Sequence, residues 1–466
     1  MKTIFLSFTA KLGLFALSIG LGVVSYFMFH HLDAAEKLNL ELEAAILPPT
    51  FQQDINLDAE AFLLAKTDSP VDLTSDAFGI FYILQRDGKV VRVAPEVGGG
   101  TTATAYGSFG SPRTDTSLGF TSIALHPNFL VKDKPGYGRF YMIASEKSGT
   151  GQPDFRPEFG GGSEHHQGVL YEYTVEDPLL TDFRGQRREL MRFSQPGKDN
   201  NLSGLAFDPA GLLYLGVGDG AAGATGDQSP SRNASSLTSA FGKVLRIDPT
   251  GTGSANGKYG IPEANPFRLV TAALPEVWAF GLRAPHSLSF DPFHRSLYIA
   301  ESGIKGKEEI NISPLGGEHF GWDLCEDAAT MSLSMKAQLA EIVTPPAVSL
   351  DLRAGLIARN TGSLVYRGES FPSLAGKILF ASHDGQLVAT NSSTGSGSTS
   401  RFSRVGVGAL GQESFTALRS GPRGELVILC ENGNVFELRK GTSIGIGGSK
   451  HRSLFCSIQG PGTPRG

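Results

Sequence analysis

The fold is decided by residues 199–249, which read DNNLSGLAFDPAGLLYLGVGDGAAGATGDQSPSRNASSLTSAFGKVLRIDP. Leu205–Phe207 predicts a short apolar strand, and Asp208–Gly211 has the composition of a turn. Leu212–Val217 predicts the next strand, which ends at a glycine loop that contains Asp219. A unit of this kind, when it is repeated, is typical of a β-propeller blade. The loop therefore places a carboxylate at a strand end, where propellers build their sites.

The same layout recurs along the chain. Leu212–Val217 is followed by a partner strand at Lys243–Ile247, and Phe78–Leu84 is followed across an Asp-Gly turn by Val90–Val93. Four further pairs share this pattern: Arg139–Ser145 with Val169–Val175, Ser296–Glu301 with Glu309–Ser313, Gly376–Ser382 with Gln386–Thr390, and Glu425–Glu431 with Asn434–Leu438. Six unevenly spaced repeats predict an all-β, six-bladed propeller over residues 70–440. A β-sandwich, which has fewer and longer strands, is the alternative.

Composition agrees with many tight turns and excludes some classes of partner. Glycine accounts for 59 of the 466 residues, well above ordinary usage, and charged residues make up only 19%. The net charge of −5 leaves no basic footprint for nucleic acid. The three cysteines are too few and too scattered for a disulfide framework or a zinc site; they are Cys325, Cys430 and Cys456.

The N-terminus predicts export. Lys2 and Lys11 precede an apolar run over residues 12–29, which is long beside the roughly 7–15 residues of a signal peptide core and approaches the roughly 17–25 of a spanning helix. No good cleavage site follows. An uncleaved anchor over residues 4–29, a cleaved signal over residues 1–32 and a buried core helix therefore remain open. The first two place the body in the periplasm or outside the cell, and the anchor would also tether it to the membrane.

The segments that flank the propeller have distinct compositions. Residues 33–69 are acidic and contain many Ala and Leu residues, which predicts a helical stalk or decoration. Asn391–Ser400 is a low-complexity surface loop by composition. Residues 441–466 are rich in Gly, Ser and Pro and predict a flexible tail.

The chain resembles the soluble pyrroloquinoline quinone (PQQ)-dependent sugar dehydrogenases, the glucose/sorbosone dehydrogenase family. The resemblance spans roughly residues 70–440. Besides residues 199–249, it rests on segments in the family's order, namely Leu125–Phe129, Ser254–Phe267, Phe280–Pro285, Glu309–Asn311 and Gly316–Trp322. It implies a six-bladed propeller that oxidises a sugar at C1, transfers the hydride to PQQ with the help of calcium, and passes electrons to an external acceptor.

The resemblance also assigns catalytic roles. Asp219 falls on the carboxylate that orients the family's catalytic histidine, and a turn residue that bonds its own loop is the alternative. Asn200 falls on the histidine itself, and an amide has no useful basicity near neutral pH. Leu202 stands where the family has a glycine close to the cofactor. Replacement of the base by His165 or His166 would require their loop to fold over the mouth.

The resemblance gives the cofactor-binding positions as Arg283, Ala284 and Asn200. Ala284 replaces the family's Asn. His286 could reach the same mouth, although a histidine packed within a blade is the alternative. The cations that clamp the cofactor in the family are not evident, because Ser382–Gly385 and Ser414–Thr416 occupy their loops.

The expected metal is calcium. The backbone carbonyls of Gly303 and Ile304 fall on ligands of the calcium ion that binds the cofactor. Glu309, with a carbonyl near Phe320, falls on ligands of a second, structural calcium ion. A solvated Glu308-Glu309 pair is the alternative.

Three functions are therefore open. The first is a PQQ-dependent sugar dehydrogenase. The second is a catalytically degenerate propeller that binds a carbohydrate or a protein, because Asn200 replaces the base. The third is a metal-dependent hydrolase, which would need converging carboxylates and histidines at the mouth.

Overall fold

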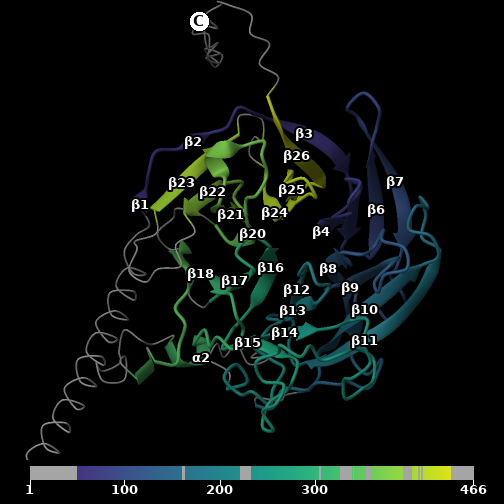
Figure 1. The fold of residues 1–466 in the computed structure, drawn as a ribbon, viewed down its shortest axis with the longest axis vertical. Coiled ribbons are helices and arrows are strands. Elements are labelled where there is room, and N and C mark those ends of the chain that lie inside the picture. The colour runs from purple at the N-terminus through teal and green to yellow at the C-terminus, as the bar shows by residue number, and fades with distance from the viewer. Residues whose placement is uncertain are drawn as a thin grey trace, which may run out of the picture.

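The computed structural model describes residues 50–159, 163–220, 232–303, 306–325, 338–339, 341–352, 358–391, 401–407, 410 and 413–441. Within these ranges the chain forms six sheets around a central axis, each built on four antiparallel strands (Figure 1). The inner strand of each sheet contacts the inner strands of the two neighbouring sheets, so the ring is closed. The predicted six-bladed propeller is confirmed.

Each blade has four strands, which follow one another from the axis outwards. Blades I and II are β4 (Pro70–Ser75), β5 (Phe81–Gln85), β6 (Lys89–Pro95), β7 (Thr101–Ser108), and β8 (Phe120–Leu125), β9 (Arg139–Lys147), β10 (His166–Val175), β11 (Gly185–Gln195). Blades III and IV are β12 (Leu202–Phe207), β13 (Leu213–Val217), β14 (Lys243–Ile247), β15 (Val277–Phe280), and β16 (Pro285–Asp291), β17 (Ser296–Ser302), β18 (Lys307–Ser313), β19 (Val348–Asp351). Blades V and VI are β20 (Asn360–Val365), β21 (Lys377–Ser382), β22 (Leu387–Asn391), β23 (Arg401–Gly406), and β24 (Phe415–Ser420), β25 (Leu426–Cys430), β26 (Asn434–Lys440), β3 (Ala59–Lys66).

Every strand pair predicted from the sequence is the second and third strand of a blade. The pair β5 and β6 aligns Phe81 with Val93, and the pair β13 and β14 aligns Leu213 with Ile247. These central strands are buried on both faces, since all residues of β13 and β25 are buried. Their apolar runs are therefore continuous rather than alternating, as in any sheet covered on both sides.

The predicted helical stalk over residues 33–69 is wrong for the part that is described. Residues 50–66 form β1 (Thr50–Phe51), β2 (Ile55–Asn56) and β3. The first two pair in parallel with β23, and β3 pairs with β26 from Lys66↔Asn434 to Ala59↔Lys440. Closure of the ring outweighs the helical composition, because β3 supplies the outer strand of blade VI. The propeller thus begins before residue 70.

Several predictions for the ends of the chain concern residues outside the described ranges. These are the signal or anchor over residues 1–32, residues 33–49 of the stalk and residues 442–466 of the tail. They stay predictions. Among the described residues, no helix has the length and apolar character needed to cross a bilayer.

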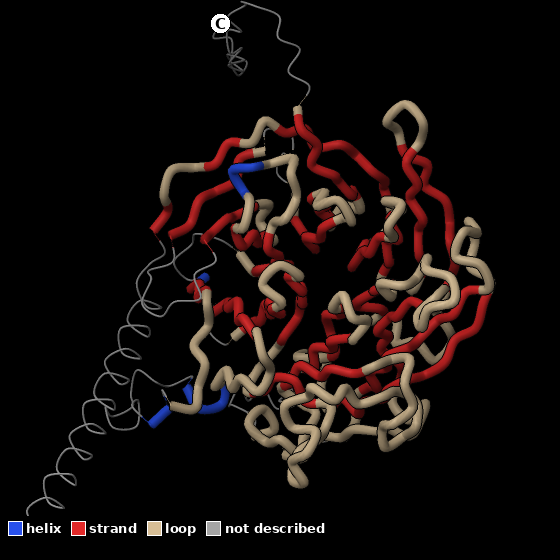
Figure 2. The backbone as a smooth tube through the Cα atoms, viewed as in Figure 1, coloured by secondary structure: helices blue, strands red, loops and turns tan. Residues whose placement is uncertain are grey.

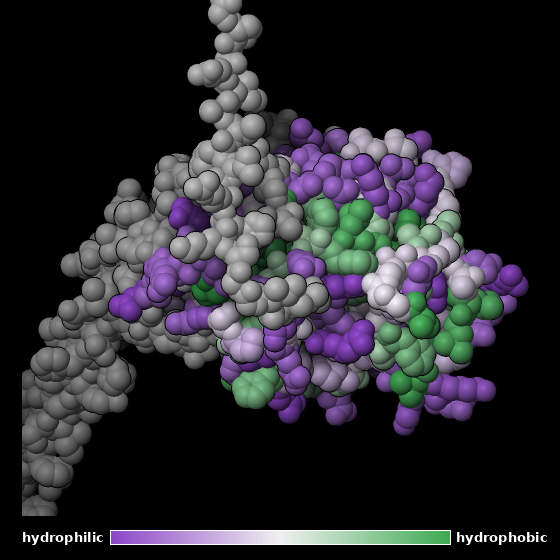
Figure 3. Space-filling model, turned by 90° about the horizontal axis from the view of Figure 1, so that it is seen from above, coloured by the Kyte–Doolittle hydropathy of each residue, from purple (hydrophilic) through white to green (hydrophobic). Residues whose placement is uncertain are grey.

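The surface seen in Figure 3 is an outer edge of the propeller. Hydrophilic and hydrophobic areas alternate over its coloured part. Large exposed apolar side chains occur in blades I to IV and in the closing strand; they include Leu63, Phe78, Val97, Leu179, Leu269 and Phe293. Scattered apolar residues of this kind are ordinary for a soluble surface.

The two ends of the propeller axis carry different connections. Figure 2 shows the connections in tan between the red strands. At one end of the axis lie the links from each outer strand to the next inner strand and the links between second and third strands. We call this end the mouth. Among others, it carries the connections 196–201, 218–242, 281–284 and 303–306, which hold the site residues predicted from the sequence.

Candidate functional site at the mouth of the propeller

A fully buried carboxylate, Asp219, lies at the mouth end of β13. Its Oδ1 accepts a hydrogen bond from the side-chain amide of Asn200 at 3.0 Å, and its Oδ2 accepts one from the indole N–H of Trp322 at 2.9 Å. The backbone N–H of Asp219 donates to the carbonyl of Arg283 at 2.8 Å. Three connections far apart in sequence are therefore joined at this one residue.

The backbone around Asn200 is shaped to let two loops meet. Asn200 has φ of 51°, a left-handed conformation in which Asn, Asp and His are enriched. A Cβ on Gly218 would lie 1.9 Å from the carbonyl oxygen of Asn200, so only glycine fits there. Leu202 is buried in the core between blades II and III rather than placed over the mouth.

Arg283 connects the site to blade IV. Its Nη1 donates to the carbonyls of Ser302 and Gly303 at 3.1 and 3.2 Å, and its guanidinium lies 5.3 Å from the ring of Trp322. Nη1 makes all of the side-chain hydrogen bonds that Arg283 forms with described residues, so Nε and Nη2 remain as donors for a ligand. A half-buried guanidinium of this kind suits a carboxylate ligand.

This arrangement does not fit a divalent cation on the carbonyl of Gly303, because that oxygen already faces the guanidinium of Arg283. Ile304, the other predicted ligand of the cofactor's calcium ion, lies outside the described residues. Ala284 contributes its backbone N–H to Glu301. The predicted roles of Gly303, Ile304 and Ala284 towards a bound group stay predictions.

A cation would instead fit an acidic pair between blades III and IV. Glu301 and Glu309 face one another across β17 and β18, and burial together with the charge of Glu309 raises the pKa of Glu301 to about 8. Asn311 is fully buried beside them. Its Nδ2 donates to Glu301 Oε1 at 2.7 Å, whereas its Oδ1 has no hydrogen-bond partner among the described residues. Two carboxylates and an unsatisfied amide oxygen are a ligand set that Ca²⁺ prefers.

The described part of the chain has no group of three or more His, Cys, Asp or Glu side chains that could hold a metal ion. The Glu301 and Glu309 site would therefore have to include amide or carbonyl oxygens. Among those residues there is therefore no set of converging carboxylates and histidines of the kind that the hydrolase hypothesis requires.

His286 lies at the mouth end of β16, the inner strand of blade IV, and it is the histidine of the six inner strands. It is the extra residue of a bulge at the start of β16. Its Nε2 lies 3.5 Å from Oε2 of Glu308, and its carbonyl accepts a hydrogen bond from Ser203 Oγ at 3.1 Å. Ser203 is three residues after Asn200, so His286 borders the same part of the mouth.

The two histidines considered as replacements for the base lie farther out. His166 is fully buried, and burial lowers its pKa to about 4. His165 is exposed and its backbone N–H donates to Gln195 at 2.8 Å. His165 precedes β10 and His166 begins it, and β10 is the third strand of blade II. Each strand adds about 4.8 Å to the distance from the inner strand. His166 is therefore unable to meet a substrate, and His165 lies well away from the axis.

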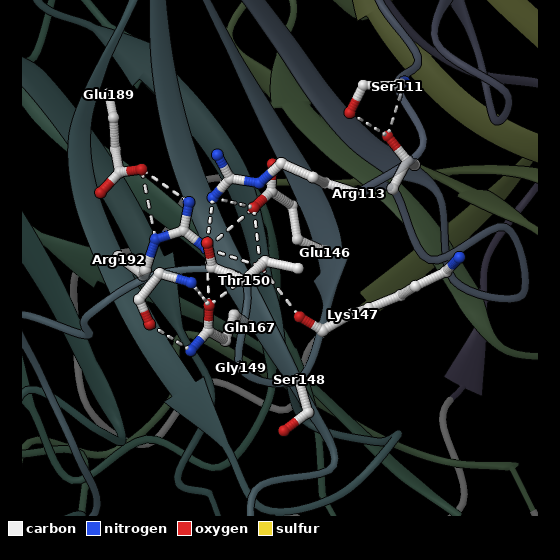
Figure 4. Close-up of polar contacts among 12 residues, drawn as sticks. Ser111, Arg113, Glu146, Lys147, Ser148, Gly149, Thr150, Gln167, Glu189 and Arg192 are labelled. Carbon is white, nitrogen blue, oxygen red and sulfur yellow. Dashed lines mark hydrogen bonds and ion pairs between the residues drawn. The ribbon is translucent and has the colours of Figure 1, made fainter.

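A polar network fixes the mouth end of blade II (Figure 4). The fully buried Arg192 pairs with Glu146 at 2.9 Å and with Glu189 at 2.6 Å, and it donates to Gln167 at 2.6 Å. Arg113 adds a second cation to Glu146 at 2.9 Å. Opposite charges and hydrogen bonds are satisfied within the network, so it stabilises the blade and leaves no charge for a ligand.

Residues 233–241, which precede β14, are anchored by a buried lysine. The Nζ of Lys243 donates to the carbonyls of Asn233, Ala234 and Phe241 at 2.7, 2.8 and 2.8 Å. Burial lowers the pKa of Lys243 to about 7, but three acceptors match the three N–H donors of an ammonium group. This lysine therefore holds the segment that leads into β14.

The loops expected to clamp the cofactor carry acid rather than base. Partial burial opposes ionisation of Asp384, yet hydrogen bonds from Ser382 and Gln386 keep its pKa below the ordinary value. Asp384 is thus a carboxylate at the mouth end of blade V. Phe415 is buried at the start of β24. Neither segment offers a cation to a cofactor.

Sequence reasoning misses two contributors to this site. Trp322 begins the short helix α2 (Trp322–Cys325), and its motif alone does not reveal that its indole binds Asp219. Lys243 reads from the sequence only as part of a strand. A tryptophan in a glycine-rich segment after β18 is the available signal, but no spacing rule links it to residue 219. Cys430 is buried and free.

Comparison with known proteins places this chain in a family. The family model described as "Glucose / Sorbosone dehydrogenase" matches residues 68–437. The HIPL1 protein of Arabidopsis thaliana is 27% identical over 304 residues, 57% of this chain and 43% of HIPL1. Aldose sugar dehydrogenase YliI of Escherichia coli is 32% identical over 146 residues, 31% of this chain and 34% of that protein. The matches thus span less than half of these relatives.

Solved structures agree on the fold. The soluble aldose sugar dehydrogenase of Escherichia coli aligns with a TM-score of 0.59 at 19% identity and covers 82% of this chain and 99% of its own. The PQQ-bound aldose sugar dehydrogenase of Streptomyces coelicolor aligns with a TM-score of 0.55 at 18% identity, over 84% and 99% of the two chains. Since the family model covers most of the propeller, the chain belongs to the glucose/sorbosone dehydrogenase family.

Proposed function

We propose that the protein is an exported sugar dehydrogenase that oxidises an aldose at C1 at the mouth of its propeller. The observation that carries the proposal is the buried Asp219, held between Asn200 and Trp322 beside Arg283. Family membership and the apolar N-terminal run support it.

The site suits a polyhydroxylated ring. Asn200 offers both a donor and an acceptor, and its hydrogen bond to the buried Asp219 holds the amide in place. The ring of Trp322 and the guanidinium of Arg283 add an aromatic face and a cation at the same edge. Such a set orients hydroxyl groups, which is what C1 oxidation requires of the protein.

Arg283 is the residue that would hold PQQ, through the donors that its contacts with Ser302 and Gly303 leave unused. When bound, the quinone supplies a two-electron acceptor for the hydride that leaves C1. Asp384 would repel a cofactor carboxylate that approached blade V, so the cofactor would lie towards blades III and IV. Electrons would then pass to an external acceptor.

Calcium is proposed for the pocket formed by Glu301, Glu309 and Asn311. The buried Asn311 Oδ1 and the raised pKa of Glu301 support it, because a bound cation would remove both the unsatisfied oxygen and the repulsion between carboxylates. The ion would fix the junction between blades III and IV, next to Arg283.

The second candidate is a propeller that binds a carbohydrate without oxidising it. The presence of Asn200 at the family's base position favours it, since an amide accepts no proton near neutral pH. Both candidates place the sugar at the same mouth and differ only in turnover.

Calorimetry of the purified protein with PQQ, with and without Ca²⁺, tests the proposal first, followed by sugar oxidation with a dye acceptor. Calcium-dependent binding and turnover of an aldose are expected. Sugar binding without PQQ binding would favour the second candidate. A folded, calcium-loaded protein that bound neither PQQ nor sugar would contradict both.

A further inference from the structure

We propose that His286, oriented by Glu308, is the base that removes the proton from the C1 hydroxyl in this chain, in place of the residue at position 200. The inference rests on the proposed dehydrogenase function. It begins from a mismatch, because the mouth keeps an orienting carboxylate at Asp219 but pairs it with Asn200, which is not a base.

Position within the blade favours His286 over the other histidines at the mouth. His286 lies on β16, an inner strand, whereas His165 precedes the third strand of blade II and His383 follows the second strand of blade V. Each strand outwards adds about 4.8 Å. Its carbonyl is bonded to Ser203, just beyond Asn200, and it lies three residues after Arg283.

The partner of His286 is a fixed carboxylate. Glu308 is buried, and its two oxygens accept hydrogen bonds from Ser302 Oγ at 2.9 and 3.1 Å. Glu308 Oε2 lies 3.5 Å from His286 Nε2, which is somewhat long for a hydrogen bond, and such contacts commonly shorten when substrate binds. A histidine held by a carboxylate is the usual arrangement of a general base.

The two ring nitrogens of His286 have different surroundings. Nε2 is buried and has no hydrogen-bond partner among the described residues, while the side chain as a whole is 24% exposed. The carboxylate of Glu308 favours the tautomer with its proton on Nε2. Nδ1 then carries the lone pair, and it is the nitrogen on the exposed part of the ring.

Other charged groups near His286 are already engaged. From β24, Arg419 reaches Ser287 Oγ at 3.3 Å, but its Nε pairs with Asp72 of β4 at 2.8 Å. Arg283 is bonded to the carbonyls of blade IV. Among the residues that the structure describes, Glu308 is thus the charged group that faces the imidazole directly.

The step balances with the quinone as oxidant. The C1 hydroxyl proton passes to His286 Nδ1, the C1 hydrogen leaves with its electron pair as a hydride, and the C1–O bond becomes a carbonyl. The sugar yields its lactone, the quinone gains two electrons, and the imidazolium later returns its proton to solvent.

The test compares the full-length protein with His286→Gln, which keeps an amide donor towards Glu308 but is not a base. The matched control is His294→Gln. That imidazole belongs to the same blade and also contacts a carboxylate, since its Nδ1 lies 2.8 Å from Asp291 Oδ2, but it lies at the opposite end of the axis. A third variant, His286→Gln with Asn200→His, restores a base at position 200.

His286→Gln is expected to lower kcat by roughly 10²- to 10⁴-fold, the usual contribution of a general base. The dissociation constant for PQQ, measured by calorimetry, should stay within about 3-fold of wild type, as should the activity of His294→Gln. The limb of the pH profile of kcat/KM that reports the base should disappear, and Asn200→His in the same chain should restore both the limb and part of the rate.

Each contrary outcome has a distinct meaning. An active wild type with an active His286→Gln variant would overturn the role of His286 and leave the proposed function standing. A loss that Asn200→His does not rescue, with the pH limb unchanged, would also overturn it. An inactive wild type with an active Asn200→His variant would overturn it and favour the binding propeller. Inactivity of both would overturn the dehydrogenase proposal as well.

Discussion

The side-chain amide of Asn200 donates a hydrogen bond to Oδ1 of Asp219 at 3.0 Å, and this bond ties the entry to β12 to the exit from β13. An imidazole in place of the amide would be both a partner for the carboxylate and a base. The pair therefore has the geometry of a base held by a carboxylate, but the amide of Asn200 accepts no proton near neutral pH.

Replacing Asn200 by His should add a base at this position. Histidine is one of the residues that tolerate the left-handed backbone of Asn200, with φ of 51°, so the loop should keep its shape. Because His286 is proposed to be the base of the wild type, the change is made in the His286→Gln background, where we expect sugar oxidation in the presence of PQQ and Ca²⁺ to rise by roughly 10²-fold. Asp199→His in the same background, which adds an imidazole to the exposed neighbour, is the control. Equal activity of His286→Gln alone and with either change would show that an imidazole at position 200 does not act as a base.

Replacing Trp322 by Phe should destabilise the protein by about 1–3 kcal/mol, because it leaves Oδ2 of the buried Asp219 without its indole donor. Urea unfolding measures the change. Trp278→Phe is the matched control, since the indole nitrogen of Trp278 is buried without a hydrogen-bond partner among the described residues. A control that lost as much stability as Trp322→Phe would show that ring volume, and not the bond to Asp219, is responsible.

Removing calcium should lower the melting temperature of the wild-type protein, because the repulsion between Glu301 and Glu309 returns. Glu309→Gln should melt at a temperature that no longer depends on Ca²⁺. Glu263→Gln, an exposed position in the connection between β14 and β15, should respond to Ca²⁺ as wild type does. Calcium titrations followed by differential scanning calorimetry measure this, and a full calcium response in Glu309→Gln would rule out this pocket as the site.

Stability should fall as the pH falls from about 6.5 to about 4, in part because of His126. Burial, with a contribution from Arg139, lowers the pKa of His126 to about 4, whereas a histidine in the unfolded chain titrates near 6.5. Between these values the unfolded chain binds a proton that the folded chain does not, so unfolding becomes easier, by on the order of 2 kcal/mol.

His126→Asn isolates this effect. The Asn128 N–H that donates to His126 Nδ1 at 3.0 Å keeps an oxygen acceptor, and the titration is removed. The difference in unfolding free energy between the two proteins should shrink as the pH is lowered from 7 to 4. A difference that stayed constant with pH would contradict the assigned shift.

A chain that begins at residue 70 should not form a stable propeller, because β26 loses its partner β3 and the buried Leu64 is removed. Exposed strand edges promote aggregation. A chain that begins at residue 50 keeps β3 and serves as the control. Size-exclusion chromatography and circular dichroism distinguish the two, and a folded monomer from the shorter chain would refute the closing role of β3.

The architecture of the propeller can be predicted from the amino-acid sequence alone. Six apolar strand pairs can be read locally from the sequence, and in a pair such as Phe78–Leu84 with Val90–Val93 the two strands are close in the chain and joined by an Asp-Gly turn. The ordered motifs also indicate the family. The inner and outer strands are not predictable in this way. The composition around β3 favours a helix, and β3 is a strand because it pairs with β26, whose residues lie about 370 positions further along the chain.

The contacts at the mouth, in contrast, depend on how the blades pack together. Asn200 and Asp219 are 19 residues apart and could be paired from motif spacing, but the bond from Trp322 to Asp219 spans 103 residues. The contact between His286 and Glu308 likewise depends on how blade IV brings the bulge of β16 beside β18. Hydrophobic periodicity records which face of a strand is buried; it does not record which polar groups meet when the ring closes.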